Sequence, residues 1–370
     1  MNILLVAGAR PNFMKVAPIM RTVQTLNRQS TNGQPLIDCR LIHTGQHYDA
    51  RMSSVFFQEL GIREPDFNLS VGSASHAVQT ACVMTRFEPV CLELKPDWVV
   101  VVGDVNSTMA CTLVAAKLGI KVAHVEAGLR SFDRSMPEEI NRLVTDALAD
   151  LLLAPSSDCC ENLRREGVPE HKIVLVGNIM IDSLLAGLAG ARASGVLHEN
   201  QVSKGGYAYV TLHRPSNVDD QATLSAIMRE LKGLSASLPV VFPMHPRTRQ
   251  RLSHFGIHCV SDRRLKIIEP VGYYDSLCLT ENARFVLTDS GGLQEETTYL
   301  RVPCLTLRPN TERPITVTLG SNRLTTLARL PQDISQILAR NDLVGQVPPL
   351  WDGRTGERIV SCLLERRADG

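Results

Sequence analysis

The sequence predicts an α/β protein made of two Rossmann-like, doubly wound domains that face a central cleft. Short apolar runs rich in Val, Ile and Leu alternate with longer helical patterns, which is typical of parallel strands joined by crossover helices. A small, polar segment near the middle of the chain separates two such alternations. The chain has 370 residues, 44% of them hydrophobic, which is enough for two hydrophobic cores.

Each half of the chain contains its own series of candidate strands, with helices expected in most of the intervals between them. Pro11 fits the start of the first helix, where a missing N–H has no cost. Asp104 and Ser290 are placed to cap or precede later helices. The candidate strands are 2–7, 38–43, 98–102, 121–125, 150–154 and 173–176, then 207–211, 239–242, 266–268, 285–288 and 303–306.

The predicted domain boundary is the stretch of small and polar residues over 189–206, because a new alternation of strand and helix begins at Tyr207. We therefore expect one domain over 1–188 and a second over 206–350. The remaining segment, 351–370, contains the pattern of a last amphipathic helix. The sequence leaves open which domain this helix packs on.

Composition excludes several classes of partner. Lys and Arg number 39 against 38 Asp and Glu, and the formal net charge of +1 gives no electrostatic footprint for nucleic acid or an anionic membrane. The N-terminus has no signal-peptide pattern, and no apolar run approaches the roughly 18 residues of a membrane span. We expect a cytoplasmic protein whose ten cysteines are reduced core residues rather than metal ligands or disulfides.

The first turn of the chain, Gly8-Ala9-Arg10-Pro11, follows a strand and opens a helix, at the sheet edge where ligands bind. Arg10 offers a planar fork for phosphate oxygens, and Lys15 returns one turn later as a point charge. The turn lacks both G-x-G-x-x-G and the Walker pattern, which argues against NAD and P-loop nucleotides. The alternative is a surface Arg and Lys at a helix start.

A second anion site is predicted at Asp289-Ser290-Gly291-Gly292, where a buried strand passes into a helix. The two glycines allow close approach of a ligand, and the helix N-terminus offers free N–H groups to a diphosphate. Glu296, one turn into the helix, can accept hydrogen bonds from ribose hydroxyls. The alternative is that Gly291 and Gly292 only make a tight turn.

Three carboxylates lie at neighbouring strand ends or at the start of the next helix: Asp104, Glu126 and Glu138. Clustered carboxylates raise one another's pKa, which suits general acid and base catalysis. Helix capping is the alternative for Asp104 and Glu138. For Glu126 the alternative is a salt bridge to Arg130 or Arg134.

The histidines divide into two groups. His213 follows the first strand of the second domain, so we expect it to face the cleft and transfer a proton to or from a leaving phosphate, with a structural role as the alternative. His43 and His47 have i, i+4 spacing but lie on a strand-to-loop segment. A zinc site there would need more ligands than the local sequence provides, so no metal is expected.

Eight motifs occur along nearly the whole chain: Gly8-Ala9-Arg10-Pro11 with Lys15, Thr44-Gly45-Gln46-His47, Val102-Gly103-Asp104, His124-Val125-Glu126-Ala127-Gly128-Leu129-Arg130, Met136-Pro137-Glu138-Glu139-Ile140-Asn141-Arg142, His213-Arg214, Asp289-Ser290-Gly291-Gly292 and Thr311-Glu312-Arg313-Pro314. Taken together and in this order, they resemble the non-hydrolysing UDP-N-acetylglucosamine 2-epimerase family. A shared order of several motifs is far more specific than any single motif.

The resemblance implies a GT-B-like pair of Rossmann domains that interconverts UDP-GlcNAc and UDP-ManNAc, with no NAD, metal or other cofactor. In the family's mechanism the C2 proton is removed and UDP is expelled, which leaves a bound 2-acetamidoglucal. Protonation of the other face of C2 and re-addition of UDP give the epimer. The resemblance also favours a homodimer and a role in polysaccharide biosynthesis, with the pathway left open.

Site residues carry over by matching motif. Asp104, Glu126 and Glu138 resemble the family's catalytic carboxylates, and which of them deprotonates C2 stays open. His213 resembles the family's cleft histidine. Gln46 and His245 match, more loosely, residues that hold a second, activating UDP-GlcNAc in some members. The matching UDP-binding positions are Arg10, Lys15, Ser290, Gly291, Gly292, Glu296 and Arg313.

The chain departs from the family pattern after Pro270, where it has Val271-Gly272-Tyr273-Tyr274-Asp275-Ser276 instead of the residues that often hold uracil. Tyr273 or Tyr274 can substitute. Three other functions use similar residues: a hydrolysing relative that releases ManNAc, a GT-B glycosyltransferase that needs an acceptor, and a UDP-sugar sensor. A sensor has no need of three convergent carboxylates.

Overall fold

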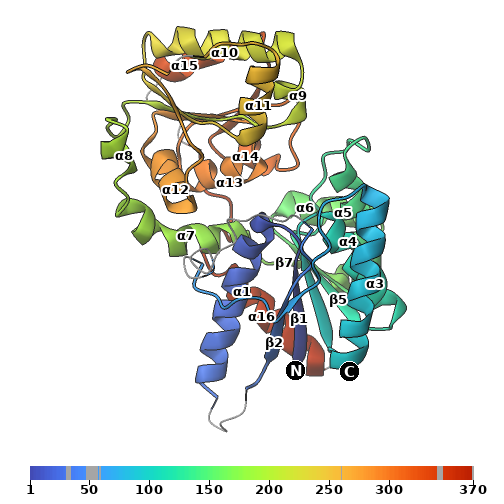
Figure 1. Ribbon diagram of the computed structural model, residues 1–370. Coiled ribbons are helices and arrows are strands. Elements are labelled where there is room, and N and C mark those ends of the chain that lie inside the picture. The colour runs from blue at the N-terminus through green and yellow to red at the C-terminus, as the bar shows by residue number, and fades with distance from the viewer. Residues whose placement is uncertain (31–34, 47–56, 58–59, 260, 340–344, 369–370) are drawn as a thin grey trace. The chain divides into compact units, whose positions relative to one another are not determined.

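The computed structural model describes residues 1–30, 35–46, 57, 60–259, 261–339 and 345–368. The chain forms two compact units: Met1–Ser183 together with Pro349–Gly370, and Leu184–Pro348. Each unit contains one fully parallel sheet with helices packed on both faces (Figure 1). This confirms the predicted α/β class and the pair of doubly wound, Rossmann-like units, the architecture of GT-B-like proteins.

The sheet of the first unit has seven strands in the order β3-β2-β1-β4-β5-β6-β7. The central strands β1, β4 and β6 are apolar runs because both faces of the sheet are covered there; β4, for example, is buried at every residue. Only β3, two residues long, was not expected from the sequence. The strand bounds are β1 Asn2–Ala7, β2 Asp38–His43, β3 Phe67–Asn68, β4 Trp98–Val102, β5 Lys121–Val125, β6 Leu151–Ala154 and β7 Ile173–Leu175.

The helices of the first unit connect these strands. Pro11 lies in the first turn of α1, as expected, and Ser75 caps α3 by accepting from the N–H of Val78. The helix bounds are α1 Arg10–Arg28, α3 His76–Leu94, α4 Asn106–Lys117, α5 Pro137–Leu148, α6 Ser157–Arg165, the short 3₁₀ helix Glu170–Lys172, α7 Ile179–Arg192 and α16 Thr355–Ala368.

The C-terminal helix α16 packs on the first unit, which answers the question that the sequence left open. The carboxylate of Asp182 accepts hydrogen bonds from the N–H groups of Thr355 (3.2 Å) and Gly356 (2.7 Å) at the start of α16. Trp351, just before the helix, is buried and donates from Nε1 to the carbonyl of Pro155. The division between the units falls inside α7, earlier than the polar segment over 189–206.

The sheet of the second unit has six strands in the order β10-β9-β8-β11-β12-β13. Successive strand residues face two separate cores: Val210 and Leu287 lie in one cluster, Tyr209 and Val286 in the other. The strand β13 was not expected from the sequence. The strand bounds are β8 Ala208–Thr211, β9 Val240–Pro243, β10 Leu265–Ile268, β11 Phe285–Thr288, β12 Cys304–Leu307 and β13 Asn322–Thr325.

The helices of the second unit cover both faces of this sheet (Figure 1). Their bounds are α8 Val196–Glu199, α9 Pro215–Val218, α10 Gln221–Ser235, α11 Pro246–His254, α12 Tyr273–Asn282, α13 Gly291–Leu300, α14 Ile315–Thr318 and α15 Leu330–Ala339. No helix in the described part of the chain is long and apolar enough to cross a membrane.

Both sheets reverse their strand order at one point, between β1 and β4 in the first unit and between β8 and β11 in the second. At such a switch point the connections leave to opposite faces of the sheet, which opens a crevice at the carboxyl ends of the two strands. The segments between these four strands and the helices that follow them are 8–9, 103–105, 212–214 and 289–290. Each of them contains a residue that the sequence singled out.

We predict that Asp182→Ala lowers the free energy of unfolding by about 1–2 kcal/mol, because two N–H groups at the start of α16 lose their acceptor. Urea unfolding followed by tryptophan fluorescence measures this, since Trp351 lies next to the docked helix. Asp182→Asn keeps one acceptor oxygen and should lose less. Equal unfolding midpoints for Asp182→Ala and the wild type would contradict the capping role.

Candidate active site

A buried ion pair joins the first helix to the loop after β5. The ammonium of Lys15 contacts Oε2 of Glu126, and both residues are less than one-tenth exposed. The other oxygen, Oε1, is buried without a hydrogen-bond partner among the described residues. Gly103 lies beside the pair at φ +69°, a conformation that favours glycine, and a Cβ there would lie 2.8 Å from the Lys15 ammonium. One oxygen of Glu126 is therefore fixed, and the other is buried without a hydrogen-bond partner among the described residues.

The backbone of Glu126 is in the left-handed region, at φ +71°. A non-glycine residue in this region costs on the order of 1–3 kcal/mol, and such strain clusters at functional sites. The Glu126 N–H donates to the carbonyl of Leu153 at the end of the neighbouring strand. The strand ends thus hold the Glu126 backbone in this conformation.

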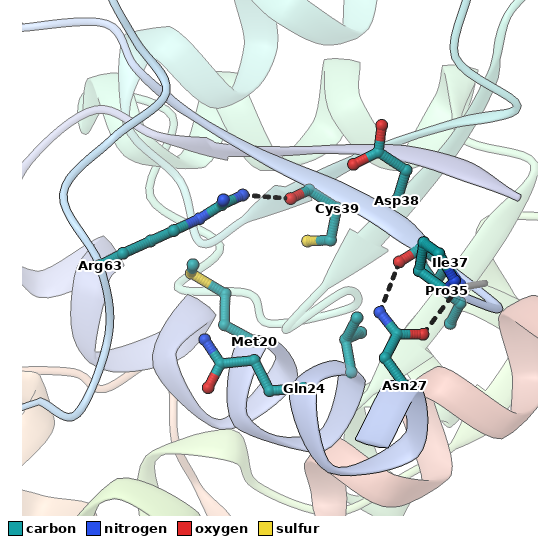
Figure 2. Close-up of a pocket in the computed structure, with 9 residues that line it drawn as sticks. Met20, Gln24, Asn27, Pro35, Ile37, Asp38, Cys39 and Arg63 are labelled. Atoms are coloured by element: carbon teal, nitrogen blue, oxygen red, sulfur yellow. Dashed lines mark hydrogen bonds between the residues drawn. The ribbon is translucent and has the colours of Figure 1, made fainter. Parts of the chain in front are cut away.

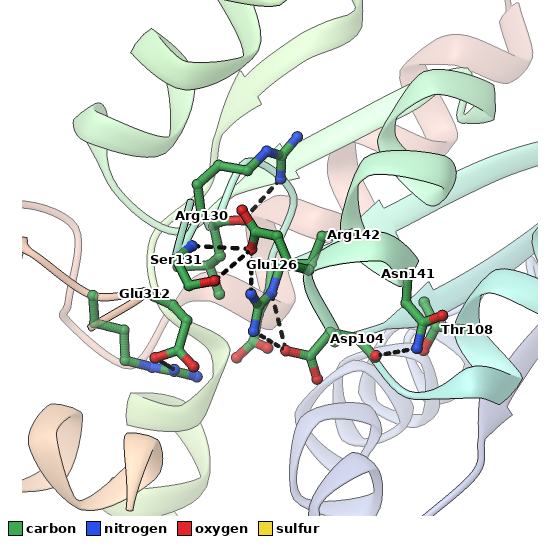
Figure 3. A network of polar contacts seen from close by, with 12 residues as sticks. Asp104, Thr108, Glu126, Arg130, Ser131, Asn141, Arg142 and Glu312 are labelled. Carbon is green, nitrogen blue, oxygen red and sulfur yellow. Dashed lines mark hydrogen bonds and ion pairs between the residues drawn. The ribbon is translucent and has the colours of Figure 1, made fainter. Parts of the chain in front are cut away.

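Asp104 lies at the end of β4 and pairs with Arg142 of α5. Its Oδ2 accepts from Nε (3.0 Å) and Nη2 (2.5 Å) of Arg142, and its carbonyl accepts from the side chain of Asn141 (Figure 3). The side chain is 27% exposed, so solvent or a substrate can reach it. Capping, the alternative from the sequence, is wrong for Asp104: α4 has Val105 at its N-cap position and no capping hydrogen bond from a side chain at that residue.

The adjacent glutamates at the start of α5 have different surroundings. Glu138, the predicted catalytic residue, is exposed to solvent. Glu139 is 1% exposed and accepts from the N–H and hydroxyl of Ser131 and from the N–H of Phe132. Its Oε2 also pairs with Nη1 of Arg142 at 2.6 Å. Glu139 and Arg142 were not predicted as site residues from the sequence, although their i, i+3 spacing is a recognisable signal for a pair on one helix face.

A buried charge network lies behind these carboxylates. His124 is fully buried, with Nδ1 2.6 Å from Oδ1 of Asp146 and Nε2 2.8 Å from the carbonyl of Gly103. Both ring nitrogens thus face oxygen atoms, one on a side chain and one on the backbone. Burial raises the pKa of Asp146, but His124 and Arg130 outweigh burial and hold that pKa below its ordinary value.

The same network fixes the loop that carries Glu126. Asp146 accepts from the N–H of Gly128 and pairs with Arg130, which also pairs with Glu166. Arg130 is therefore committed to Asp146 and Glu166, and the partner of Glu126 is Lys15. The salt bridge from Glu126 to Arg130, an alternative from the sequence, is wrong.

The first turn is held by a side chain of α1. Oδ1 of Asn12 accepts from the N–H groups of Gly8 and Ala9, both at 2.9 Å. A Cβ at Gly8 would lie 2.5 Å from the hydroxyl of Ser107, so the turn approaches α4 closely. Arg10 begins α1 at this turn and is partly exposed.

Gln46 has a structural environment in this unit. It is 5% exposed, and its Oε1 accepts from the N–H and the hydroxyl of Ser107 at the start of α4. His47, beside it in the sequence, lies outside the described residues. His43 is buried, and burial lowers its pKa although its Nδ1 lies 3.1 Å from the carbonyl of Ala7.

A separate pocket of about 190 Å³ lies beside α1 and β2 (Figure 2). Arg63 crosses it and donates to the carbonyl of Cys39 at 2.7 Å. Burial raises the pKa of the Cys39 thiol to about 12, so the thiol stays protonated. The residues that line this pocket include none of the predicted site residues.

In the second unit, Asp289 orients His213. Asp289 is fully buried at the end of β11, and its carboxylate lies 3.0 Å from Nδ1 of His213. It also accepts from the N–H groups of His213 and Arg214 and from the side chain of Asn217. Burial raises the pKa of Asp289, but His213 and these donors lower it more. The His213 side chain is 41% exposed, so its Nε2 edge can reach a ligand.

The two glycines at the start of α13 let other groups come close to the backbone. Ser290 is the N-cap residue, and its own N–H donates to Oγ1 of Thr288, so the free donors begin at Gly291 rather than at Ser290. A Cβ at Gly291 would lie 2.7 Å from the Arg313 guanidinium, whereas Gly292 faces open space. Arg313, which lies outside α13, pairs with Glu295 of that helix. The helix start therefore combines free N–H groups with a fixed guanidinium.

Glu296 is buried one turn further along α13. Burial, together with the neighbouring Glu295, raises the pKa of Glu296 to about 8. His245 is the N-cap residue of α11 and accepts from the N–H of Arg247, while its ring lies 5.4 Å from that of His213 between centroids.

Tyr273 and Tyr274, the possible substitutes for a uracil contact, pack on α7. A Cβ at Gly187 would lie 3.0 Å from the ring of Tyr273, and one at Gly190 would lie 2.7 Å from the ring of Tyr274. Both rings also contact the hydrophobic cluster on this face of the sheet. The two tyrosines thus complete the core of the second unit.

We predict that Glu296→Gln removes a pH dependence of stability. A carboxyl whose folded pKa is raised from 4.5 to about 8 destabilises the folded state as pH rises between these two values, by about 1.4 kcal/mol for each pH unit. The variant should therefore match the wild type near pH 5 and exceed it near pH 9 in urea unfolding. Glu269→Gln, at an exposed glutamate, is the control. A difference in unfolding free energy between Glu296→Gln and the wild type that stays the same at every pH would contradict the raised pKa of Glu296.

Comparison with known proteins assigns the family. The family model for UDP-N-acetylglucosamine 2-epimerase matches residues 29–364. The UDP-N-acetylglucosamine 2-epimerase of Methanocaldococcus jannaschii is 42% identical over 372 residues, covering 98% of this chain and 99% of the relative. The UDP-2,3-diacetamido-2,3-dideoxy-D-glucuronate 2-epimerase of Pseudomonas aeruginosa is 40% identical over 335 residues, with 89% of each chain covered.

Solved structures agree. The crystal structure of the Methanocaldococcus jannaschii UDP-GlcNAc 2-epimerase in complex with UDP-GlcNAc and UDP superimposes with a TM-score of 0.88. The superposition covers 99% of this chain and all of that one. A match of the family model across most of the chain, relatives at this identity and near-complete structural coverage lead to one conclusion. The chain belongs to the UDP-N-acetylglucosamine 2-epimerase family.

Proposed function

We propose that the protein catalyses the reversible epimerisation of UDP-N-acetylglucosamine to UDP-N-acetylmannosamine through elimination and re-addition of UDP. The observation that carries this proposal is the buried carboxylate of Glu126. Lys15 fixes one of its oxygens, and the other has no hydrogen-bond partner among the described residues. A proton on C2 of a sugar is weakly acidic, so its removal needs a base held at a defined position. A carboxylate on a fixed loop, with one oxygen not used in any hydrogen bond among the described residues, suits this role.

Two further carboxylates are proposed as acid and base partners of Glu126. Asp104 is held by Arg142, and part of its side chain reaches solvent. Glu138 is exposed in the first turn of α5, on the helix that also carries Arg142. Inversion at C2 needs proton transfer at two faces of the sugar, so more than one carboxylate is required.

The second unit is proposed to bind UDP. The free N–H groups at Gly291 and Gly292, with Arg313 beside them, suit a diphosphate that gains charge when it is expelled. Glu296 is proposed to accept from the ribose hydroxyls, and His213, oriented by Asp289, to exchange a proton with the phosphate. Arg10, Lys15 and Ser290 complete the proposed substrate contacts. Gln46 and His245 remain proposed contacts for a second, activating UDP-GlcNAc.

The test is incubation with UDP-GlcNAc in deuterated water, followed by NMR. We expect UDP-ManNAc as the product, with deuterium at C2 and without any acceptor. Free ManNAc as the main product would favour the hydrolysing alternative, and turnover that needs an acceptor would favour a glycosyltransferase. Because one relative is named for a diacetamido glucuronate substrate, UDP-2,3-diacetamido-2,3-dideoxy-D-glucuronate belongs in the same assay.

We predict that Asp104→Asn and Glu126→Gln each lower kcat by roughly 10²–10⁴-fold, because an amide cannot exchange the C2 proton. Glu138→Gln is expected to do the same. Glu161→Gln is a matched control at an exposed helical glutamate. A UDP-sugar sensor predicts the opposite outcome, namely that all four variants behave like the wild type in turnover.

A homodimer is proposed through the exposed face of α3. Val78 and Leu92 are 53% and 57% exposed, and they lie at helical spacing on the same side of α3 as Ala81, Thr85 and Glu88. Exposed apolar side chains on one face of a helix favour a contact surface, and a helix that packs on its own symmetry copy satisfies a twofold interface. We also propose a cytoplasmic location and a role in polysaccharide biosynthesis, because the proposed product is an activated sugar.

We predict that Leu92→Asp converts the dimer to a monomer, because the new charge would be buried against the second copy. Size-exclusion chromatography with light scattering measures the mass. Leu36→Asp, at another exposed leucine, should leave the mass unchanged. A wild-type protein that is already a monomer would exclude this interface.

A further inference from the structure

Phe132 combines two features that folding alone does not favour. Its side chain is 74% exposed, the highest value among the exposed large hydrophobic residues of the described chain. Its backbone lies in the left-handed region, at φ +57°, which bulky side chains rarely adopt. Strain of this kind persists only where the surrounding structure imposes it.

The surrounding structure does impose it, through Glu139. The N–H of Phe132 donates to Oε1 of Glu139 at 2.9 Å, and the N–H and hydroxyl of Ser131 donate to Oε2 at 3.0 Å. Glu139 is 1% exposed and pairs with Nη1 of Arg142. The backbone of residues 131–132 is therefore fixed by a buried carboxylate.

Arg142 also connects this anchor to the proposed chemistry. Its Nη1 contacts Glu139, while its Nε and Nη2 contact the carboxylate of Asp104 (Figure 3). One guanidinium thus sets both the carboxylate of Asp104 and the loop that presents Phe132. The backbone that carries the aromatic ring is therefore connected, through Arg142, to a proposed acid or base.

Ordinary structural roles do not account for Phe132. A side chain with this exposure contributes little to the core. A turn that needs the left-handed conformation is more stable with glycine, asparagine or aspartate. Phe132 therefore costs stability through its backbone without gaining it through burial, which points to a role in binding or chemistry.

We propose that Phe132 covers the sugar ring of the bound UDP-sugar and excludes water from C1 and C2 while UDP is detached. This rests on the proposed function. Elimination breaks the C2–H and C1–O bonds and forms a C1=C2 double bond. Water can then add OH to C1 and H to C2, which releases a free 2-acetamido sugar and leaves UDP behind. A flat apolar ring over the sugar suppresses this loss.

The test is the product ratio of Phe132→Ala with UDP-GlcNAc, followed by proton and phosphorus NMR. We expect the released products, namely free sugar, 2-acetamidoglucal and UDP, to rise about tenfold or more relative to UDP-ManNAc. Phe132→Tyr retains the ring and should restore a ratio close to that of the wild type. Leu148→Ala, at an exposed apolar residue at the end of α5, should leave the ratio unchanged.

Measurements of thermal stability and of oligomeric mass distinguish this role of Phe132 from a structural one. Phe132→Gly removes the backbone strain, so its thermal midpoint should equal or exceed that of the wild type. Its ratio of released products to UDP-ManNAc should rise as it does in Phe132→Ala. Three results would overturn the proposal: an unchanged product ratio in Phe132→Ala, a loss of turnover without released products, or conversion of a dimer to a monomer. If the wild type makes no UDP-ManNAc, the proposed function itself fails.

Discussion

The buried pair of Lys15 and Glu126 is the interaction on which the rest of the candidate site depends. Burial of two charges is expensive unless they are paired at close range, so neither residue can be moved or removed alone. The backbone around the pair is unusual at two positions. A Cβ at Gly103 would lie 2.8 Å from the ammonium, and the backbone of Glu126 is left-handed. His124, fixed between Gly103 and Asp146, then ties the ends of β4 and β5 together.

The two units divide the chemistry between them. The switch point of the first sheet collects carboxylates and their cationic partners, which suit proton transfer at carbon. The switch point of the second sheet collects a helix N-terminus, a guanidinium and an oriented histidine, which suit an anion that gains charge. Doubly wound sheets bind ligands at these points because the strand order reverses there. The same topology therefore supplies two different kinds of site.

Much of this arrangement could be predicted from the sequence. The long apolar strands, the turn after β1 and the glycines at the start of α13 were found because backbone geometry dictates their residue types. The two-residue strand β3 was missed because so short a segment has no periodicity. The terminal strand β13, Asn322–Thr325, was missed because its residues, Asn-Arg-Leu-Thr, do not form an apolar run. The boundary between the two units was harder to predict than the helices and strands. The units divide inside α7, where no polar segment marks the change.

Within the site, the sequence identified residue types better than partners. It selected Glu138 for its place at a helix start, but burial and hydrogen bonds distinguish Glu139, and burial is a property of the folded chain. The sequence pattern suggested that the N–H of Ser290 is free, although this N–H donates a hydrogen bond to the hydroxyl of Thr288. It offered Arg130 as a partner for Glu126, whereas Lys15, more than a hundred residues earlier, occupies that position. Contacts this distant in sequence leave no local pattern.

The most direct test of the central claim follows the bond between C1 and the diphosphate. UDP-GlcNAc labelled with ¹⁸O in the bridging position would be incubated with the protein, and the label would be located by phosphorus NMR in both epimers. If UDP is expelled and held before it returns, the label must spread into the non-bridging β-phosphate oxygens as UDP-ManNAc forms. Formation of UDP-ManNAc with all of the label still in the bridge would contradict the elimination and the role of Glu126 that depends on it.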